Sequence, residues 1–135
     1  MIDSKLIYLP KNEDSRGNLS FFESNNHIPF DIKRSYWIYD VPGGQKRGGH
    51  AYKAQHEFII ALSVSFDVKI HDGISERIFS LNRSYYGLYV PNMMWREMFN
   101  FSTNSLALIV SSTNFSDSDY IRDFNEFQKL ALYEK

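Results

Sequence analysis

The 135-residue chain contains no cysteine. This absence excludes disulfides, thiolate metal ligands and cysteine nucleophiles, and it fits a reducing compartment. No apolar run approaches the roughly 18 residues of a membrane-spanning helix, and no signal-peptide pattern opens the sequence. The net charge is −1, so no general electrostatic attraction to nucleic acid or to an anionic membrane exists. We therefore expect a cytoplasmic protein that binds neither nucleic acid nor membrane.

Apolar side chains are plentiful, because hydrophobic residues make up 43% of the chain and aromatic residues 16%. This length and composition predict one domain, residues 1–135, with a real core. Short alternating segments separated by turn residues indicate an all-β barrel or jelly roll of about ten strands. The expected strands are 6–9, 19–23, 33–40, 47–62, 66–70, 75–81, 86–91, 95–99 and 106–110.

Local signals predict the turns and the end of the chain. Asp72-Gly73 favours a hairpin turn. Val64 lies at a strand turn, where a positive φ would strain a valine. The polar run 116–119 offers helix-capping residues, and the apolar spacing from Tyr120 through Phe124 and Phe127 predicts a short C-terminal amphipathic helix.

The run from Arg47 to Lys53, Arg-Gly-Gly-His-Ala-Tyr-Lys, carries the strongest functional signal. In an extended segment His50 and Tyr52 share a face, since residues two apart point the same way. Histidine titrates near neutral pH, and a phenol near a cationic group can have its pKa lowered. The pattern fits a proton-transfer site, whereas the simpler alternative is cross-strand packing.

A metal centre is not expected. His50, His56 and Glu57 could give only a partial ligand set, and the neighbours His56 and Glu57 point to opposite faces of a strand. We therefore predict no metal and no other cofactor.

The chain resembles the sugar 3,4-ketoisomerases of the RmlC-like cupins (FdtA/QdtA type, also called WxcM-like). The resemblance is carried, in order, by Asp-Ser-Arg-Gly-Asn-Leu at 14–19, Ile-Pro-Phe-Asp-Ile-Lys-Arg at 28–34, the run 47–53, Gly-Leu-Tyr-Val-Pro at 87–91, Trp-Arg-Glu-Met at 95–98 and Asp-Tyr-Ile-Arg-Asp-Phe at 119–124. Two positions depart from the family pattern, because Tyr52 and Arg96 stand where these proteins commonly have histidine.

The resemblance implies a cupin, RmlC-like jelly-roll β-barrel that forms a homodimer with exchanged N-terminal strands. It implies an isomerase that converts dTDP-4-keto-6-deoxyglucose to a dTDP-3-keto-6-deoxyhexose through an enediol, for the deoxyamino sugars of bacterial surface polysaccharide. Two alternatives stay open: a non-catalytic cupin that binds a nucleotide sugar, and a related dTDP-sugar epimerase.

The same resemblance suggests roles for nine residues. His50 is the expected base, Tyr52 a donor or relay, and Arg96 a cation that stabilises the enediolate. Arginines suit the substrate's diphosphate, aromatic faces suit its base and sugar, and a carboxylate can orient a neighbour. The expected substrate-binding residues are Arg16, Arg47, Tyr36, Trp37, Trp95 and Glu97. Lys33 and Arg34 are interpreted as a solvated basic pair.

Overall fold

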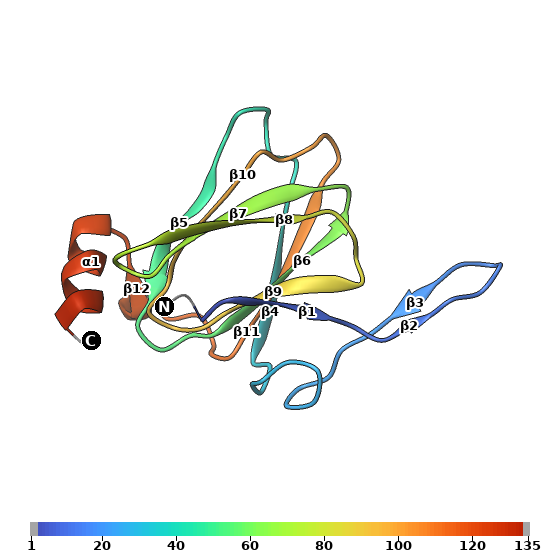
Figure 1. Cartoon of the computed structure of the whole chain (residues 1–135), viewed down its shortest axis with the longest axis horizontal. Coiled ribbons are helices and arrows are strands. Elements are labelled where there is room, and N and C mark those ends of the chain that lie inside the picture. The colour runs from blue at the N-terminus through green and yellow to red at the C-terminus, as the bar shows by residue number, and fades with distance from the viewer. Residues whose placement is uncertain (1–2, 134–135) are drawn as a thin grey trace.

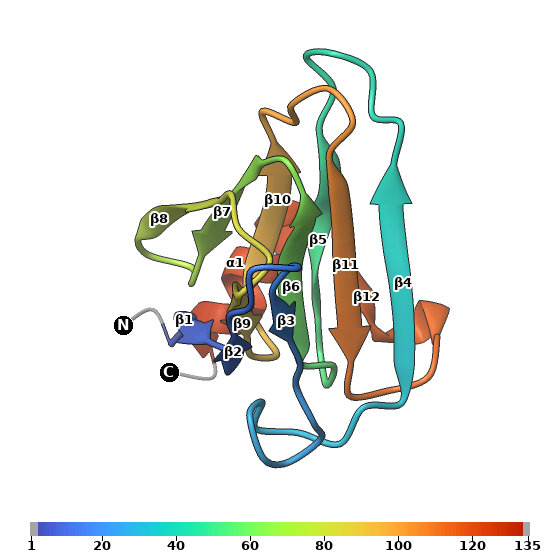
Figure 2. The ribbon, with the colours of Figure 1, turned by 90° about the vertical axis from the view of Figure 1, so that its right-hand side faces the viewer.

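A computed structural model describes residues 3–133 of the chain. Two five-stranded antiparallel sheets lie face to face, with strand orders β1-β9-β6-β11-β4 and β12-β5-β10-β7-β8 (Figures 1 and 2). The strands of the first sheet are β1 (Lys5–Tyr8), β4 (Arg34–Tyr39), β6 (Glu57–Ser63), β9 (Tyr86–Val90) and β11 (Leu106–Ser111). Those of the second are β5 (Arg47–Tyr52), β7 (Phe66–His71), β8 (Glu76–Leu81), β10 (Trp95–Phe99) and β12 (Tyr120–Ile121).

The predicted alternation of side chains builds the core between the sheets. On β7 every second residue is buried, and Phe66, Val68 and Ile70 join the main apolar cluster. On β4, Tyr36 and Ile38 pack against this cluster, whereas Trp37 and Tyr39 are exposed on the other face. The period of two read from the sequence therefore assigns inward and outward residues correctly.

Each sheet has a further cover on its outer face. The segment 21–33 closes part of the first sheet through Phe22, Ile28 and Phe30, which pack on Phe58. Helix α1 (Phe124–Tyr133) closes part of the second sheet, with Phe127 and Ala131 buried. It is not long and apolar enough to cross a membrane, and no other α-helix occurs within residues 3–133.

A small hairpin of β2 (Lys11–Asn12) and β3 (Leu19–Ser20) projects from the body of the molecule (Figure 1). Its side chains Leu19 and Phe21 are largely exposed.

The predicted strand 47–62 is wrong as one element. The chain breaks after Tyr52, and β5 and β6 belong to different sheets. The Asp119 carboxylate stabilises this corner by accepting hydrogen bonds from the backbone N–H groups of Ala54 (2.8 Å) and Gln55 (3.2 Å). Because this partner is 64 residues away from Gln55, the sequence around the break gives no sign of it.

The helix also begins later than expected. A short 3₁₀ turn at Asp117–Asp119 is followed by β12, in which Tyr120 pairs with Tyr52, before α1 starts at Phe124. Asp123 supplies the cap, because its Oδ2 accepts the backbone N–H of Glu126 at 3.0 Å. The residues at 116–119 therefore do not cap α1, and Tyr120 lies outside it.

Two turn predictions are confirmed. The turn that carries Asp72-Gly73 joins β7 to β8, and Gly73 has φ +107°. Val64, between β6 and β7, has φ +60° and is half exposed. A β-branched residue in this region is strained.

Candidate active site

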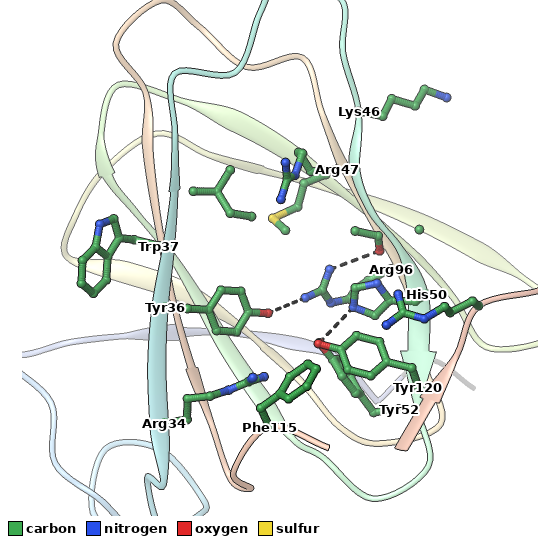
Figure 3. Close-up of a pocket in the computed structure, with 15 residues that line it drawn as sticks. Arg34, Tyr36, Trp37, Lys46, Arg47, His50, Tyr52, Arg96, Phe115 and Tyr120 are labelled. Atoms are coloured by element: carbon green, nitrogen blue, oxygen red, sulfur yellow. Dashed lines mark hydrogen bonds between the residues drawn. The ribbon is translucent and has the colours of Figure 1, made fainter. Parts of the chain in front are cut away.

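The main cavity opens between the inner faces of β4, β5 and β10 (Figure 3). It has a volume of about 540 Å³. The segment 115–122 closes one side of it. The lining side chains that can form polar or aromatic contacts are Arg34, Tyr36, Trp37, Lys46, Arg47, His50, Tyr52, Arg96, Phe115, Tyr120 and Arg122.

His50 and Tyr52 share the inner face of β5, as their spacing predicts. The Nε2 atom of His50 lies 3.0 Å from the hydroxyl of Tyr52, within hydrogen-bond distance. Tyr120 packs against both rings, with centroid distances of 4.9 Å to His50 and 4.7 Å to Tyr52. The imidazole is therefore held by one hydrogen bond and two aromatic contacts.

Arg96 is the buried cation of the site, with 1% of its surface exposed. Its Nε and Nη2 donate to the two carboxylate oxygens of Glu57, at 2.6 and 3.1 Å. Nη2 also donates to the Tyr36 hydroxyl at 2.8 Å, and that hydroxyl donates to Glu57 at 2.6 Å. Gln55 completes the cluster by donating to the same carboxylate at 3.1 Å. These bonds fix Arg96 and Tyr36 as one unit.

Gly48 makes room for this arginine. Its φ is +75°, and its carbonyl accepts a hydrogen bond from Arg96 Nη1 at 3.2 Å. A Cβ atom at Gly48 would overlap that same nitrogen. Arg96 lines the cavity, and among residues 3–133 its Nη1 donates only this one hydrogen bond.

His50 is held in its neutral form. Burial, together with the positive charges of Arg96 and Arg122, lowers its pKa to about 2. A neutral imidazole has one N–H and one lone pair, so it offers an acceptor position for a proton, although this low pKa makes it a weak base in the ligand-free chain. Across the 3.0 Å contact, that proton can be exchanged with the Tyr52 hydroxyl.

The expectation that a nearby cation lowers the pKa of Tyr52 is wrong. Burial and the negative charge of Glu57 raise this pKa, and they outweigh the opposing effect of Arg96. Burial likewise raises the pKa of Tyr36. Both phenols therefore stay protonated at neutral pH, so Tyr52 can donate or relay a proton as a neutral hydroxyl.

Four further cations surround the mouth of the cavity, and all are more exposed than Arg96: Arg34, Lys46, Arg47 and Arg122. Arg34 lies over the rings of Tyr36 (5.0 Å) and Phe115 (5.4 Å), and its buried Nε has no hydrogen-bond partner in the described chain. Arg122 lies over Tyr120 and forms an exposed ion pair with Asp117. This ring of positive charge suits an anionic group.

The structure brings together six of the nine predicted site residues: His50, Tyr52, Arg96, Arg47, Tyr36 and Trp37. Trp37 touches the cavity only at its rim, because its ring is on the outer face of β4 and points away in Figure 3.

The other three lie elsewhere. Trp95 and Glu97 are on the opposite face of β10 from Arg96, where Trp95 packs on Phe124 and Phe127 and donates its indole N–H to Glu97 at 3.3 Å. Arg16 is at the projecting hairpin, paired with Asp14. In a single copy of the chain none of the three lines the cavity, because strand alternation and hairpin position direct them away.

Several residues of the site were not predicted as site residues from the sequence, among them Arg34, Tyr120, Arg122 and Glu57. The prediction of a solvated Lys33–Arg34 pair is wrong for Arg34, which alternates inward with Tyr36 on β4. Tyr120 and Arg122 were hidden by the helix prediction. Of these residues only Glu57 could have been identified from the sequence. It is the first residue of a strand expected to be buried, and a buried carboxylate requires a partner.

Residues 3–133 contain no group of three histidines or carboxylates placed to hold a metal ion. His56 binds the Tyr89 hydroxyl through Nδ1 at 2.7 Å, whereas Glu57 faces Arg96, so these neighbours do point to opposite sides.

The fold and the site together define the class. Two antiparallel sheets of jelly-roll type, with a polar cavity between their inner faces, make this protein a cupin of the RmlC-like kind. The model of the WxcM-like, C-terminal (FdtA) family matches residues 2–132. The chain therefore belongs to the WxcM-like, C-terminal (FdtA) family.

Individual relatives agree with this assignment. The chain is 37% identical over 128 residues to TDP-4-oxo-6-deoxy-alpha-D-glucose-3,4-oxoisomerase of Aneurinibacillus thermoaerophilus, covering 95% of this chain and 92% of that protein. A 3,4-ketoisomerase structure from Helicobacter canadensis superposes with a TM-score of 0.94 at 36% identity, covering 98% and 99% of the two chains.

A third relative was solved with a sugar nucleotide. It is a mutant of the 3,4-ketoisomerase QdtA from Thermoanaerobacterium thermosaccharolyticum, in complex with TDP-4-keto-6-deoxyglucose. Its TM-score is 0.95 at 32% identity, and the match covers 98% of this chain and 96% of that one.

Proposed function

We propose that this protein is a 3,4-ketoisomerase that converts dTDP-4-keto-6-deoxyglucose to a dTDP-3-keto-6-deoxyhexose. The observation that carries the proposal is the placement of a neutral His50, hydrogen-bonded to Tyr52, beside the Arg96 guanidinium in one cavity. The relative from Aneurinibacillus thermoaerophilus is named as a 3,4-oxoisomerase of TDP-4-oxo-6-deoxy-alpha-D-glucose. The QdtA mutant was solved in complex with TDP-4-keto-6-deoxyglucose.

The reaction moves two protons and no other atoms. His50 takes the proton from C3, and the electrons of the C–H bond form the C3–C4 double bond while the C4 carbonyl oxygen becomes an oxyanion. The Nη1 group of Arg96 stabilises this enediolate. The proton is then delivered to C4, while the hydroxyl proton at C3 is transferred to the oxygen at C4, with Tyr52 as relay.

The rest of the substrate is assigned to the mouth of the cavity. Arg47, together with Arg34 and Arg122, binds the diphosphate, because guanidinium groups match phosphate oxygens. Tyr36 contacts the sugar, and the exposed ring of Phe115 offers a surface to the thymine. The positions of Trp95 and Glu97 support a role in packing α1 in place of substrate contact.

The working form is proposed to be a homodimer with exchanged N-terminal strands. The projecting β2–β3 hairpin, its exposed Leu19 and Phe21, and the exposed Trp37 on the first sheet support this arrangement. In such a dimer the hairpin carries Arg16 away from its own cavity toward the partner. Light scattering of the purified protein tests the oligomeric state.

We place the reaction in the cytoplasm, because a sugar nucleotide with a charged diphosphate does not cross a bilayer unaided. Its product would feed the synthesis of deoxyamino sugars for bacterial surface polysaccharide. The whole chain, residues 1–135, would act as one catalytic domain.

Proton NMR in deuterated water tests the activity. Incubation with dTDP-4-keto-6-deoxyglucose should remove the C3 proton signal and produce a 3-keto sugar with deuterium at C4. His50→Asn should abolish both changes while dTDP still binds in calorimetry. A wild-type protein that binds dTDP but exchanges no proton would contradict the isomerase and favour the non-catalytic nucleotide-sugar binder.

A further inference from the structure

The cavity has a buried inner end and an exposed mouth that differ in charge. The inner end contains the ion pair of Arg96 and Glu57, each with 1% of its side chain exposed. The mouth carries four cations, Arg34, Lys46, Arg47 and Arg122. Within residues 3–133 only Arg122 of these four has a carboxylate partner, and its ion pair with Asp117 is exposed. Exposed pairs of this kind are weak.

Glu57 is the group that produces the difference. Both of its oxygens are occupied by Arg96, and one also accepts from Tyr36 and Gln55. Burial alone would lower the pKa of Arg96, but the charge and hydrogen bonds of Glu57, together with Tyr36 and Tyr52, outweigh it and raise that pKa. Arg96 and Glu57 thus form an ion pair that has no net charge.

An unpaired guanidinium at the inner end would be the strongest anion site in the cavity. It would be buried, held in place by Gly48, and able to present several N–H groups to a phosphate. The diphosphate of a sugar nucleotide would then compete with the sugar for the catalytic end. Free phosphate and pyrophosphate would bind there as well.

We propose that Glu57 is an orientation-determining residue, which neutralises the inner end of the cavity so that the diphosphate stays at the mouth and the uncharged sugar reaches His50. This inference rests on the proposed function for the identity of the ligand. Glu57 contacts no reacting atom in this scheme, and it acts through Arg96 and Tyr36 as a positioning residue.

Inorganic phosphate is the probe for the test, with thermal unfolding as the readout. In Glu57→Gln, phosphate should bind about tenfold more tightly than in the wild type, because it pairs with the Arg96 charge that Glu57 no longer neutralises. Its addition should raise the melting temperature of this variant well above the small shift of the wild type. Glu57→Asp, which keeps the charge, and Glu76→Gln, an exposed carboxylate on β8, should both respond like the wild type.

A double variant keeps the proposal testable if Glu57→Gln does not fold. Glu57→Gln with Arg96→Met removes both charges, so no uncompensated charge is left in the core. This variant should be inactive, insensitive to phosphate and able to bind dTDP within about threefold of the wild type. A loss of dTDP affinity would mean that the diphosphate lies on Arg96, and this would overturn the proposal.

These readouts do not depend on turnover. An inactive wild type with the predicted phosphate response would refute the isomerase and leave the role of Glu57 intact. An active wild type whose Glu57→Gln variant folds and shows no added phosphate response would refute only the role of Glu57.

Discussion

Replacing Gly48 by alanine should damage catalysis much more than replacing Gly49. A Cβ added at Gly48 would overlap Arg96 Nη1, whereas at Gly49 the nearest side-chain atoms are 3.8 Å (Trp95) and 3.9 Å (Glu97) away. Gly48 also has φ +75°, and Gly49 does not share this conformation. The two variants add the same methyl group at adjacent positions, so they form a matched pair.

The expected size follows from three effects of Gly48→Ala. The left-handed backbone costs about 1–2 kcal/mol for a non-glycine residue. Displacing Nη1 breaks its bond to the Gly48 carbonyl, a charged hydrogen bond of about 1.5–3 kcal/mol. Loss of one donor to a developing oxyanion reduces kcat by about 10²–10³-fold. We therefore expect destabilisation of roughly 2.5–5 kcal/mol and a kcat lower by about two orders of magnitude.

The assays are urea unfolding and the rate of C3 proton loss by NMR. Gly49→Ala should unfold within about 1 kcal/mol of the wild type, because its new contacts are ordinary van der Waals distances. It should also keep kcat within about threefold of the wild type, since it does not move Arg96. A folded Gly48→Ala with wild-type kcat would refute the role given to Arg96, and equal losses in both variants would refute the steric argument.

Three further predictions concern pH, backbone strain and the mouth of the cavity. The folded-state pKa of His50, about 2, lies below its ordinary value of 6.5, so kcat/KM should show no ionisation near pH 6.5. Below pH 6.5 His50 binds a proton in the unfolded chain but not in the folded one, so the free energy of unfolding should fall as pH is lowered from 6.5 toward 2. In urea titrations at several pH values, His50→Asn should remove this part of the acid sensitivity. Val64→Gly should stabilise the fold by about 1 kcal/mol, because it relieves a valine at φ +60°; an unchanged denaturation midpoint would count against strain there. Arg34→Met should weaken dTDP binding about tenfold in calorimetry. The control Lys33→Met removes an exposed lysine paired with Asp31 and should leave dTDP binding unchanged. Equal effects of the two variants would show that Arg34 acts only through overall charge.

Strand alternation and turn chemistry were readable from the sequence because both are local. The period of two correctly predicted that His50 and Tyr52 share a strand face and that Tyr36 and Trp37 lie on opposite faces. Asp72-Gly73 correctly predicted the hairpin turn between two strands. The order of motifs was enough to indicate the family and its jelly-roll fold, and the comparisons confirm it. The same local reasoning failed at the break after Tyr52 and at the start of α1, where Asp119 and β12 impose contacts from far along the chain.

The charge of the site was decided only by the tertiary structure. Arg96 and Glu57 are 39 residues apart, and only the packing of the two sheets makes them a buried pair. Burial, which no local pattern specifies, keeps His50 neutral and raises the pKa values of Tyr36 and Tyr52. The sequence thus determined which chemical groups the site could use, and the folded chain determined which were charged and which faced the cavity, since solvation and pairing depend on neighbours brought together in space.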